Sequence, residues 1–276
     1  MFHLDPNQSY VMPAHFGPRY MGEKTSGCYH DVTAVAVSYV TDRERLAAYV
    51  PAPYEVNDEA LVTVYYACNK KIDWLAGNGY NMIAVNAAVT FNGEHEQLRG
   101  TYTLVIWENL ADPILIGREV QGIPKIYADI PEHSVTDGQW RCSASHFGHK
   151  ILDLCAGDLS PVSQADIAAG QNAIKDQNNP MAWRFLPAIG GFGPPAVNEA
   201  VIFPSEDTFS EVHVGTGSID WQRLSWEQNP TQYHIVNALE ALPVLEYRPA
   251  LVTRGSTNLA LPERWTRALG PVTVGG

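Results

Sequence analysis

Lys125 is the residue of this sequence whose surroundings best suit covalent chemistry. Its neighbours Val120, Ile123, Pro124 and Ile126 offer no counter-charge. Because burial disfavours an ammonium ion, a lysine in such surroundings is expected to have a pKa lowered toward neutrality. A neutral amine is a nucleophile that forms a Schiff base with a carbonyl group. The alternative interpretation is that Lys125 extends from the end of a strand to solvent.

A second group of reactive side chains is Cys142, His146, His149 and Cys155. Zinc accepts such ligands, but this spacing fits no usual zinc finger or ribbon. If the segment is a strand, His146 and His149 point to opposite faces of it. We therefore expect two buried cysteines and two partly exposed histidines here rather than a metal site.

The residues around Lys125 carry a family resemblance. Gly-Arg-Glu at 117–119, followed by Pro124 and Lys125, resembles the Schiff-base lysine motif of the acetoacetate decarboxylase family, and Phe-Asn-Gly at 91–93 lies upstream at the family's spacing. Weaker matches extend the resemblance over residues 32–262. The resemblance implies that Lys125 forms an imine with a ketone and that no separate cofactor is needed.

The sequence departs from the family pattern at four charged positions. A second lysine follows the nucleophile in decarboxylases of the family, and Ile126 stands there in this chain. On the register fixed by residues 91–93, Tyr65 and Met82 align with the family's two active-site glutamates, and Val32 with its arginine. Desolvation must then lower the pKa of Lys125 by itself. A substrate pocket that includes Met82 and Ile126 is expected to be more apolar than is usual in the family.

Five further residues are candidates for the substrate pocket or its support. Arg118 is a possible contact for an anionic substrate, and we expect Glu119 to support the conformation of the segment. Tyr65, Tyr80 and Tyr102 lie on predicted strands, where most tyrosines are packing residues. A tyrosine that faces inward near Lys125 would instead be available as a proton donor.

The elements that must position these residues are mostly strands. Alternating and β-rich segments predict strands at 31–40, 60–68, 82–91, 100–107, 114–116, 134–143, 146–154, 196–203, 211–215 and 244–254. Helices are predicted at 43–50, 164–175 and 232–242. The glycine-rich stretch 190–195 is predicted to be a mobile or site-lining loop, and the tail beyond residue 254 to be loop-like.

This pattern predicts one mainly β domain. Many short strands, close turn signals and few helices are typical of an antiparallel β protein, and we find no linker that would divide residues 1–276. Residues 1–27 are predicted to form an irregular N-terminal arm. The family resemblance implies a single-domain β-barrel or cone around Lys125, in a homo-oligomer.

The composition of the chain limits the classes of partner that we expect it to bind. The 30 acidic and 18 basic residues give a net charge of −12, which argues against nucleic acid or an anionic membrane as a partner. The sequence shows no secretory signal and no apolar run of membrane-spanning length. We expect a cytoplasmic protein with free thiols that acts on a small keto acid or ketone.

Three functions remain open on the sequence. The first is a Schiff-base-forming lyase, for which decarboxylation of a β-keto acid is the family default. The second is an aldolase, retro-aldolase or dehydratase that uses the same lysine imine, as homologues with an altered pocket do. The third is a non-catalytic barrel that binds a small molecule and keeps an idle lysine.

Overall fold

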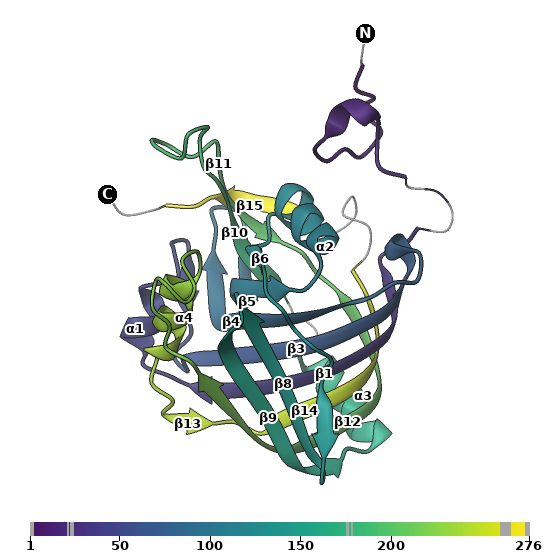
Figure 1. Cartoon of the computed structure of the whole chain (residues 1–276), viewed down its shortest axis with the longest axis vertical. Helices are drawn as coiled ribbons and strands as arrows, with labels where there is room; N and C mark the ends of the chain where they lie inside the picture. The colour runs from purple at the N-terminus through teal and green to yellow at the C-terminus, as the bar shows by residue number, and fades with distance from the viewer. Residues whose placement is uncertain are drawn as a thin grey trace.

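The computed structural model describes residues 3–20, 22, 25–174, 177, 179–259 and 266–273. Within them, one strongly curved sheet contains all the strands (Figure 1). The strands are β1 (Cys28–Val40), β2 (Tyr54–Val56), β3 (Leu61–Ile72), β4 (Tyr80–Asn92), β5 (Gln97–Glu108), β6 (Lys125–Tyr127), β7 (Ser134–Thr136), β8 (Gln139–His146), β9 (His149–Pro161), β10 (Pro180–Leu186), β11 (Val197–Ile202), β12 (Glu206–Trp221), β13 (Glu246–Tyr247), β14 (Ala250–Asn258) and β15 (Arg267–Pro271).

The main path through the sheet runs β15-β11-β10-β5-β4-β3-β1-β14-β12-β9-β8-β7, while β2, β6 and β13 pair at its sides. The prediction of a mainly β protein is confirmed. Two pairings are parallel, β5 with β6 and β5 with β10, so the sheet is mixed rather than purely antiparallel. The path has two ends, β15 and β7, so the described strands form a curved open sheet and do not close into a complete barrel.

The long strands β3, β4 and β5 separate two environments, because successive side chains of a strand point to opposite faces. On one face, Val64, Val85 and Trp107 belong to the main hydrophobic core and are fully buried. On the other face, Tyr65 and Ala84 form part of a smaller cluster. The first face stabilises the fold, and the second is available to bind a ligand.

The predicted strand at 114–116 is wrong. Ala111–Ile116 is helix α2, and it continues directly into a π-helix, η3 (Gly117–Gln121). Asp112 and Pro113 lie in the first turn of α2, where an acidic side chain is favourable and proline needs no amide hydrogen. The apolar run that follows was too short to distinguish a strand from a buried helix.

Strand boundaries shift for physical reasons. The predicted strand 134–143 is divided into β7 and β8 by a turn at Asp137 and Gly138, whose φ angles are 51° and 76°. Strands β2, β6, β10 and β15 were missed, and β15 corrects the prediction of a loop-like tail. Three of them are short, and the pairing of β6 with β5 and of β15 with β11 depends on partners far away in the sequence.

The predicted helices are all present. Helix α1 (Arg43–Ala47) begins where Asp42 accepts a hydrogen bond from the Arg45 amide. Helix α3 (Gln164–Ile174) ends one residue before Lys175, which lies outside the described residues, and α4 (Tyr233–Glu240) follows Gln232. Short 3-10 helices η1 (Ala14–Phe16) and η2 (Asp73–Leu75) complete the set.

The other candidate segments take no part in a site. The loop at 190–195 is exposed, with Phe192 91% accessible, and none of its residues lines the cavity described below. Cys142 is buried, and the described residues contain no group of three or more His, Cys, Asp or Glu arranged to hold a metal ion. Among the helices of the described chain, none combines the length and apolar character needed to cross a membrane.

Candidate active site

Lys125 begins strand β6, which lies parallel to the end of β5. Lys125 pairs with Ile106, Ile126 with Trp107 and Tyr127 with Glu108. Paired residues on neighbouring strands point to the same face. The pairing therefore places Lys125 on the face of Ile106 and Glu108, away from the Trp107 core.

Glu108 supplies the counter-charge that the sequence around Lys125 lacks. Its Oε1 lies 2.8 Å from Lys125 Nζ, and the two side chains are 0% and 7% exposed. Nζ also donates a hydrogen bond to the backbone oxygen of Pro113 at 3.3 Å. Glu108 Oε2 has no hydrogen-bond partner among the described residues. The lysine therefore shares a largely dry site with one carboxylate that retains a free acceptor oxygen.

Burial raises the pKa of the Glu108 carboxyl group above its ordinary value, while the charge of Lys125 opposes that rise. Removing a charge from water is costly unless a partner compensates for it. The ionic form of the pair carries this desolvation cost, and the neutral form does not. Transfer of one proton from Nζ to Glu108 removes both charges at once and leaves a neutral amine.

Gly117 makes room for the lysine side chain. A Cβ atom at this position would lie 2.5 Å from Lys125 Cδ and 2.9 Å from Nζ. Gly117 stands at the junction of α2 and η3, and the short π-helical turn brings its backbone against the lysine. π-Helical turns inside helices often occur at functional sites. The glycine of the 117–119 motif therefore has a steric role at the site.

Polar contacts fix the backbone on both sides of Lys125. Arg118 Nη1 donates to the backbone oxygen of Lys125 at 3.0 Å. Behind the strand, Gln232 accepts a hydrogen bond from Trp107 Nε1 at 2.9 Å and donates to the Tyr127 backbone oxygen at 2.8 Å. Gln232 thereby joins β5 to β6 at the level of the Lys125–Glu108 pair. Glu108 and Lys125 are therefore positioned by two connected strands of the sheet and not by a loop.

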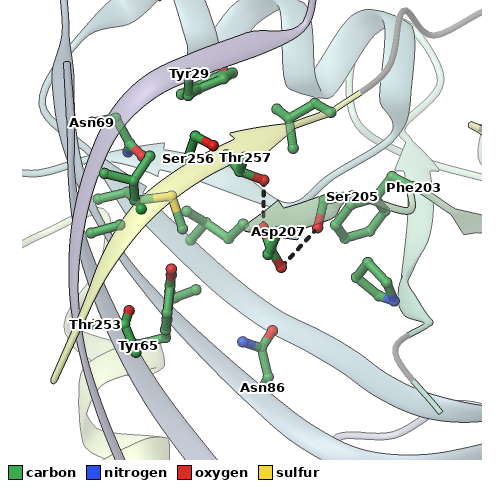
Figure 2. Close-up of a pocket in the computed structure, with 18 of the residues that line it drawn as sticks. Tyr29, Tyr65, Asn69, Asn86, Phe203, Ser205, Asp207, Thr253, Ser256 and Thr257 are labelled. Carbon is green, nitrogen blue, oxygen red and sulfur yellow. Dashed lines mark hydrogen bonds between the residues drawn. The ribbon is translucent and has the colours of Figure 1, made fainter. Parts of the chain in front are cut away.

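A cavity of about 210 Å³ lies on the same face of the sheet (Figure 2). Lys125 and Glu108 border it through their strand neighbours, since Ile106 pairs with Lys125 and Met82 pairs with Glu108. Ile106 and Met82 are both part of the cavity wall. The ion pair therefore lies beside the wall of this cavity, next to Ile106 and Met82 on neighbouring strands.

Several predicted pocket residues meet in this cavity. Tyr65, Tyr80 and Met82 line it, as does Val32. Val32, Tyr65 and Met82 are the positions that align with the family's arginine and two glutamates, so the register inferred from residues 91–93 brings three separate strand positions to one cavity.

Two tyrosines close the cavity on the side of Glu108. The hydroxyl groups of Tyr29 and Tyr80 lie 3.2 Å apart, and Trp74 Nε1 donates to Tyr29 at 3.2 Å. Burial raises the pKa of Tyr29 to about 12, and the charge of Glu108 contributes to the increase. Burial likewise raises the pKa of Tyr80 well above its ordinary value. Both phenols therefore stay protonated and are able to donate hydrogen bonds.

Four other predicted site residues lie elsewhere. Tyr102 packs against Tyr54, with ring centroids 4.8 Å apart, and belongs to the main core. Arg118 and Tyr102 border a separate surface depression. Ile126 packs against the main core because it points to the opposite face from Lys125. Glu119 Oε2 accepts a hydrogen bond from the Met12 amide at 3.0 Å, so it connects the N-terminal arm to η3.

Sequence reasoning missed Glu108 and Asp207. Glu108 follows the predicted strand 100–107 directly, and alternation from Ile106 places its side chain on the face of Lys125. That signal was available in the sequence. Asp207 lies far along the chain on β12, and only the pairing of β12 with β14 brings it to the cavity.

The chain is similar to known proteins over most of its length. The sequence profile of the family described as Acetoacetate decarboxylase (ADC) matches residues 11–256. The acetoacetate decarboxylase of Burkholderia vietnamiensis is 32% identical over 130 residues, which are 44% of this chain and 50% of the relative. The chain thus matches about half the length of its curated relatives.

Solved structures show the same fold over nearly the whole chain. An acetoacetate decarboxylase superimposes with a TM-score of 0.72 and 18% identity, covering 95% of each chain. The enduracididine biosynthesis enzyme MppR superimposes with a TM-score of 0.70 and 16% identity, covering 98% of this chain and 99% of MppR. With the profile match over residues 11–256, these similarities show that the chain belongs to the acetoacetate decarboxylase family.

Proposed function

We propose that the chain is an imine-forming carbon–carbon lyase in which Lys125 attacks the carbonyl carbon of a ketone or keto acid. The observation that carries this proposal is the buried contact of 2.8 Å between Lys125 Nζ and Glu108 Oε1 beside a cavity. A lysine that only extends to solvent would not need to be buried beside a carboxylate. A nucleophilic lysine needs a low-dielectric environment and a nearby base.

Glu108 is the proposed base for this step. It accepts a proton from the Lys125 ammonium, and the neutral Nζ then forms a bond to the carbonyl carbon. Protonation of the resulting hydroxyl group by Glu108 releases water and leaves an iminium ion. The carboxylate that remains balances the iminium charge, as it balanced the ammonium before the reaction.

The iminium ion withdraws electrons from the neighbouring carbon atom. In a β-keto acid, the bond to the carboxylate breaks, carbon dioxide leaves, and the electron pair forms an enamine. Protonation of the enamine carbon and hydrolysis of the iminium by water release the ketone and restore Lys125. The lysine imine is the electron sink, so this proposal assigns no separate cofactor.

A second reaction is favoured by the charges in the cavity. Among the described residues, its wall contains Asp207 but no lysine, arginine or histidine. The leaving carboxylate of a β-keto acid would find no cationic partner in this described wall. Aldol, retro-aldol or dehydration chemistry uses the same imine without a leaving carboxylate. The structural neighbour MppR has been solved with pyruvate and with the condensation product of pyruvate and imidazole 4-carboxaldehyde, and this supports the second reaction.

Substrate access requires a small movement of the wall. Met82 lines the cavity and is the strand partner of Glu108, and its side chain has three rotatable bonds. A change of its rotamer would open a path from the cavity toward Nζ without a change in the sheet. Ile106, on the Lys125 side, is branched and more rigid.

The test is reductive trapping with borohydride, followed by intact mass measurement and peptide mapping. The full chain is incubated separately with acetoacetate, pyruvate and longer keto acids before reduction. We expect an adduct on Lys125, and its mass shows whether carbon dioxide or an aldehyde has left. Lys150, which is exposed on β9, serves as the internal control. Lack of a Lys125 adduct with every carbonyl compound would favour a non-catalytic binding protein.

A further inference from the structure

The wall of the cavity formed by β12 and β14 contains a carboxylate. Asp207 pairs with Thr257 across the two strands, and Asp207 Oδ1 accepts a hydrogen bond from Thr257 Oγ1 at 2.5 Å. Ser205 Oγ lies 3.5 Å from Asp207 Oδ2. Figure 2 shows these three side chains together at the cavity. The hydroxyl groups fix the orientation of the carboxylate but do not neutralise its charge.

No cation of the described chain faces Asp207. Asp207 takes part in none of the ion pairs found among the described lysines, arginines and histidines, and the described cavity wall contains no basic residue. A partly buried carboxylate without a cation is costly and attracts a positive charge. The negative potential of the cavity therefore selects against a second anionic group on a substrate.

One further polar group in the wall, the side-chain amide of Asn69, lacks a partner within the described residues. Asn69 is 4% exposed, and its Nδ2 makes no hydrogen bond within the described residues. Burial raises the pKa of Tyr65 far above its ordinary value, and the charge of Asp207 adds to the increase. Tyr65 is therefore a neutral phenol that shares the cavity with Asp207. Buried polar groups in native proteins are normally hydrogen-bonded, so the unpartnered Asn69 amide indicates a polar ligand.

We propose that Asp207 binds a cationic nitrogen group, such as an ammonium or guanidinium, at the end of the substrate distant from the reacting carbonyl. Asn69 and Tyr65 then hydrogen-bond polar atoms along the chain that joins the two ends. This inference rests on the proposed function for the role of the cavity as the substrate site. It adds the substrate class, a ketone or keto acid with a basic substituent.

The first experiment measures binding without imine chemistry. Isothermal titration calorimetry is performed on the full chain with butylguanidinium, pentanol and valerate, which are similar in length and differ in charge. We expect butylguanidinium to bind at least tenfold more tightly than valerate. Asp207→Asn should weaken butylguanidinium binding by about tenfold to a hundredfold, the usual range for a hydrogen bond to a charged group. Glu206→Gln is the matched control, because Glu206 is the exposed neighbour on the same strand.

The second experiment uses the reaction. Borohydride trapping at Lys125 is compared for 5-guanidino-2-oxopentanoate, 2-oxohexanoate and 2-oxoadipate, whose reacting ends are identical. Asp207→Asn should remove the preference for the guanidino compound, while thermal unfolding verifies that the variant is folded. Equal binding of the three calorimetric probes, or an unchanged preference in Asp207→Asn, would overturn the inference. Absence of trapping in all proteins, with selective binding of butylguanidinium intact, would overturn only the proposed function.

Discussion

Lys125 Nζ and Glu108 Oε1 lie 2.8 Å apart inside the sheet, at the ends of two parallel strands that are adjacent in space. Seventeen positions separate the two residues in the sequence, and the intervening chain forms α2 and η3. This arrangement replaces the expectation that desolvation acts alone on Lys125. Burial disfavours the charged forms of both groups, and their contact compensates for part of that cost. The Glu108 carboxylate compensates for the cost of burying the Lys125 ammonium, and it also provides an acceptor for the ammonium proton.

The pair gives a pH-dependent prediction for stability. In Lys125→Met, Glu108 loses the cation that opposes the burial-induced rise of its pKa. The folded pKa then lies further above the unfolded value, so the folded state binds the extra proton and stability falls as pH rises through this interval. We expect a cost of about 3 kcal/mol at pH 8, the usual loss when a buried pair is broken, and a smaller cost at pH 5.

Denaturant unfolding at several pH values measures this effect. The double variant Lys125→Met/Glu108→Gln is the control, because it removes both charges. It should recover most of the stability of Lys125→Met and lose the dependence on pH. A Lys125→Met protein whose unfolding free energy is flat between pH 5 and pH 8 would show that Glu108 does not become an unpaired buried carboxylate.

A methyl group at Gly117 should disturb catalysis more than folding. In Gly117→Ala, the new Cβ atom would lie within 3 Å of Lys125 Cδ, Cε and Nζ. These atoms are the end of a flexible side chain, so the lysine moves rather than the backbone. We expect at least a tenfold loss of imine trapping, with a change of thermal midpoint of only a few degrees.

Gly170→Ala is a suitable control for that variant. Gly170 lies in α3, and a Cβ atom there meets nothing within 4 Å. The Gly170→Ala variant should trap substrate at the wild-type rate and gain slightly in stability, because alanine favours a helix. Wild-type trapping by Gly117→Ala would mean that Lys125 reaches its substrate from another position.

The sequence was informative wherever a local pattern decides the structure. Alternation predicted the long strands β1, β3, β4 and β5, and a helix was predicted to begin at residue 43, where α1 follows its Asp42 cap. The mainly β fold followed from these elements. The short strand β6 could not be predicted, because its three residues pair only with a partner on β5 that tertiary structure brings to it. Local propensity carries little information about such strands.

The site was predictable in part for the same reason. Lys125 has a local sequence motif, and the positions of Val32, Tyr65 and Met82 followed from the family resemblance and meet at the cavity. Ile126 was assigned to the pocket because it follows Lys125, but alternation along β6 turns it into the core. Asp207 had no local signal, since its position depends on the register between β12 and β14.

Arg118 provides a test between a substrate contact and a structural role. Its guanidinium donates to the Lys125 backbone oxygen and lies at a different depression from the cavity. Arg118→Gln should therefore slow trapping of all keto acids by a similar factor. The ratio of trapping for 2-oxoadipate to that for 2-oxohexanoate should stay as in the wild type. A selective loss of 2-oxoadipate would instead identify Arg118 as an anion contact.

Gln232 is predicted to stabilise the site from behind. It is 5% exposed and hydrogen-bonds both the Trp107 indole and the Tyr127 backbone oxygen. Gln232→Leu leaves the Trp107 indole N–H and the Tyr127 backbone oxygen without this partner, which costs about 2–6 kcal/mol at 1–3 kcal/mol for each group, less what the leucine recovers. Because these groups connect β5 to β6, the loss should also reduce imine trapping at Lys125.

Chemical denaturation and trapping measured on the same preparation test this link. Gln97→Leu is the control, since Gln97 is an exposed strand residue whose side chain donates a hydrogen bond to the exposed Asn92. Its unfolding free energy should stay within about 0.5 kcal/mol of the wild type, with unchanged trapping. If Gln232→Leu loses stability but traps at the wild-type rate, the connection between β5 and β6 supports the fold without positioning Lys125 against Glu108.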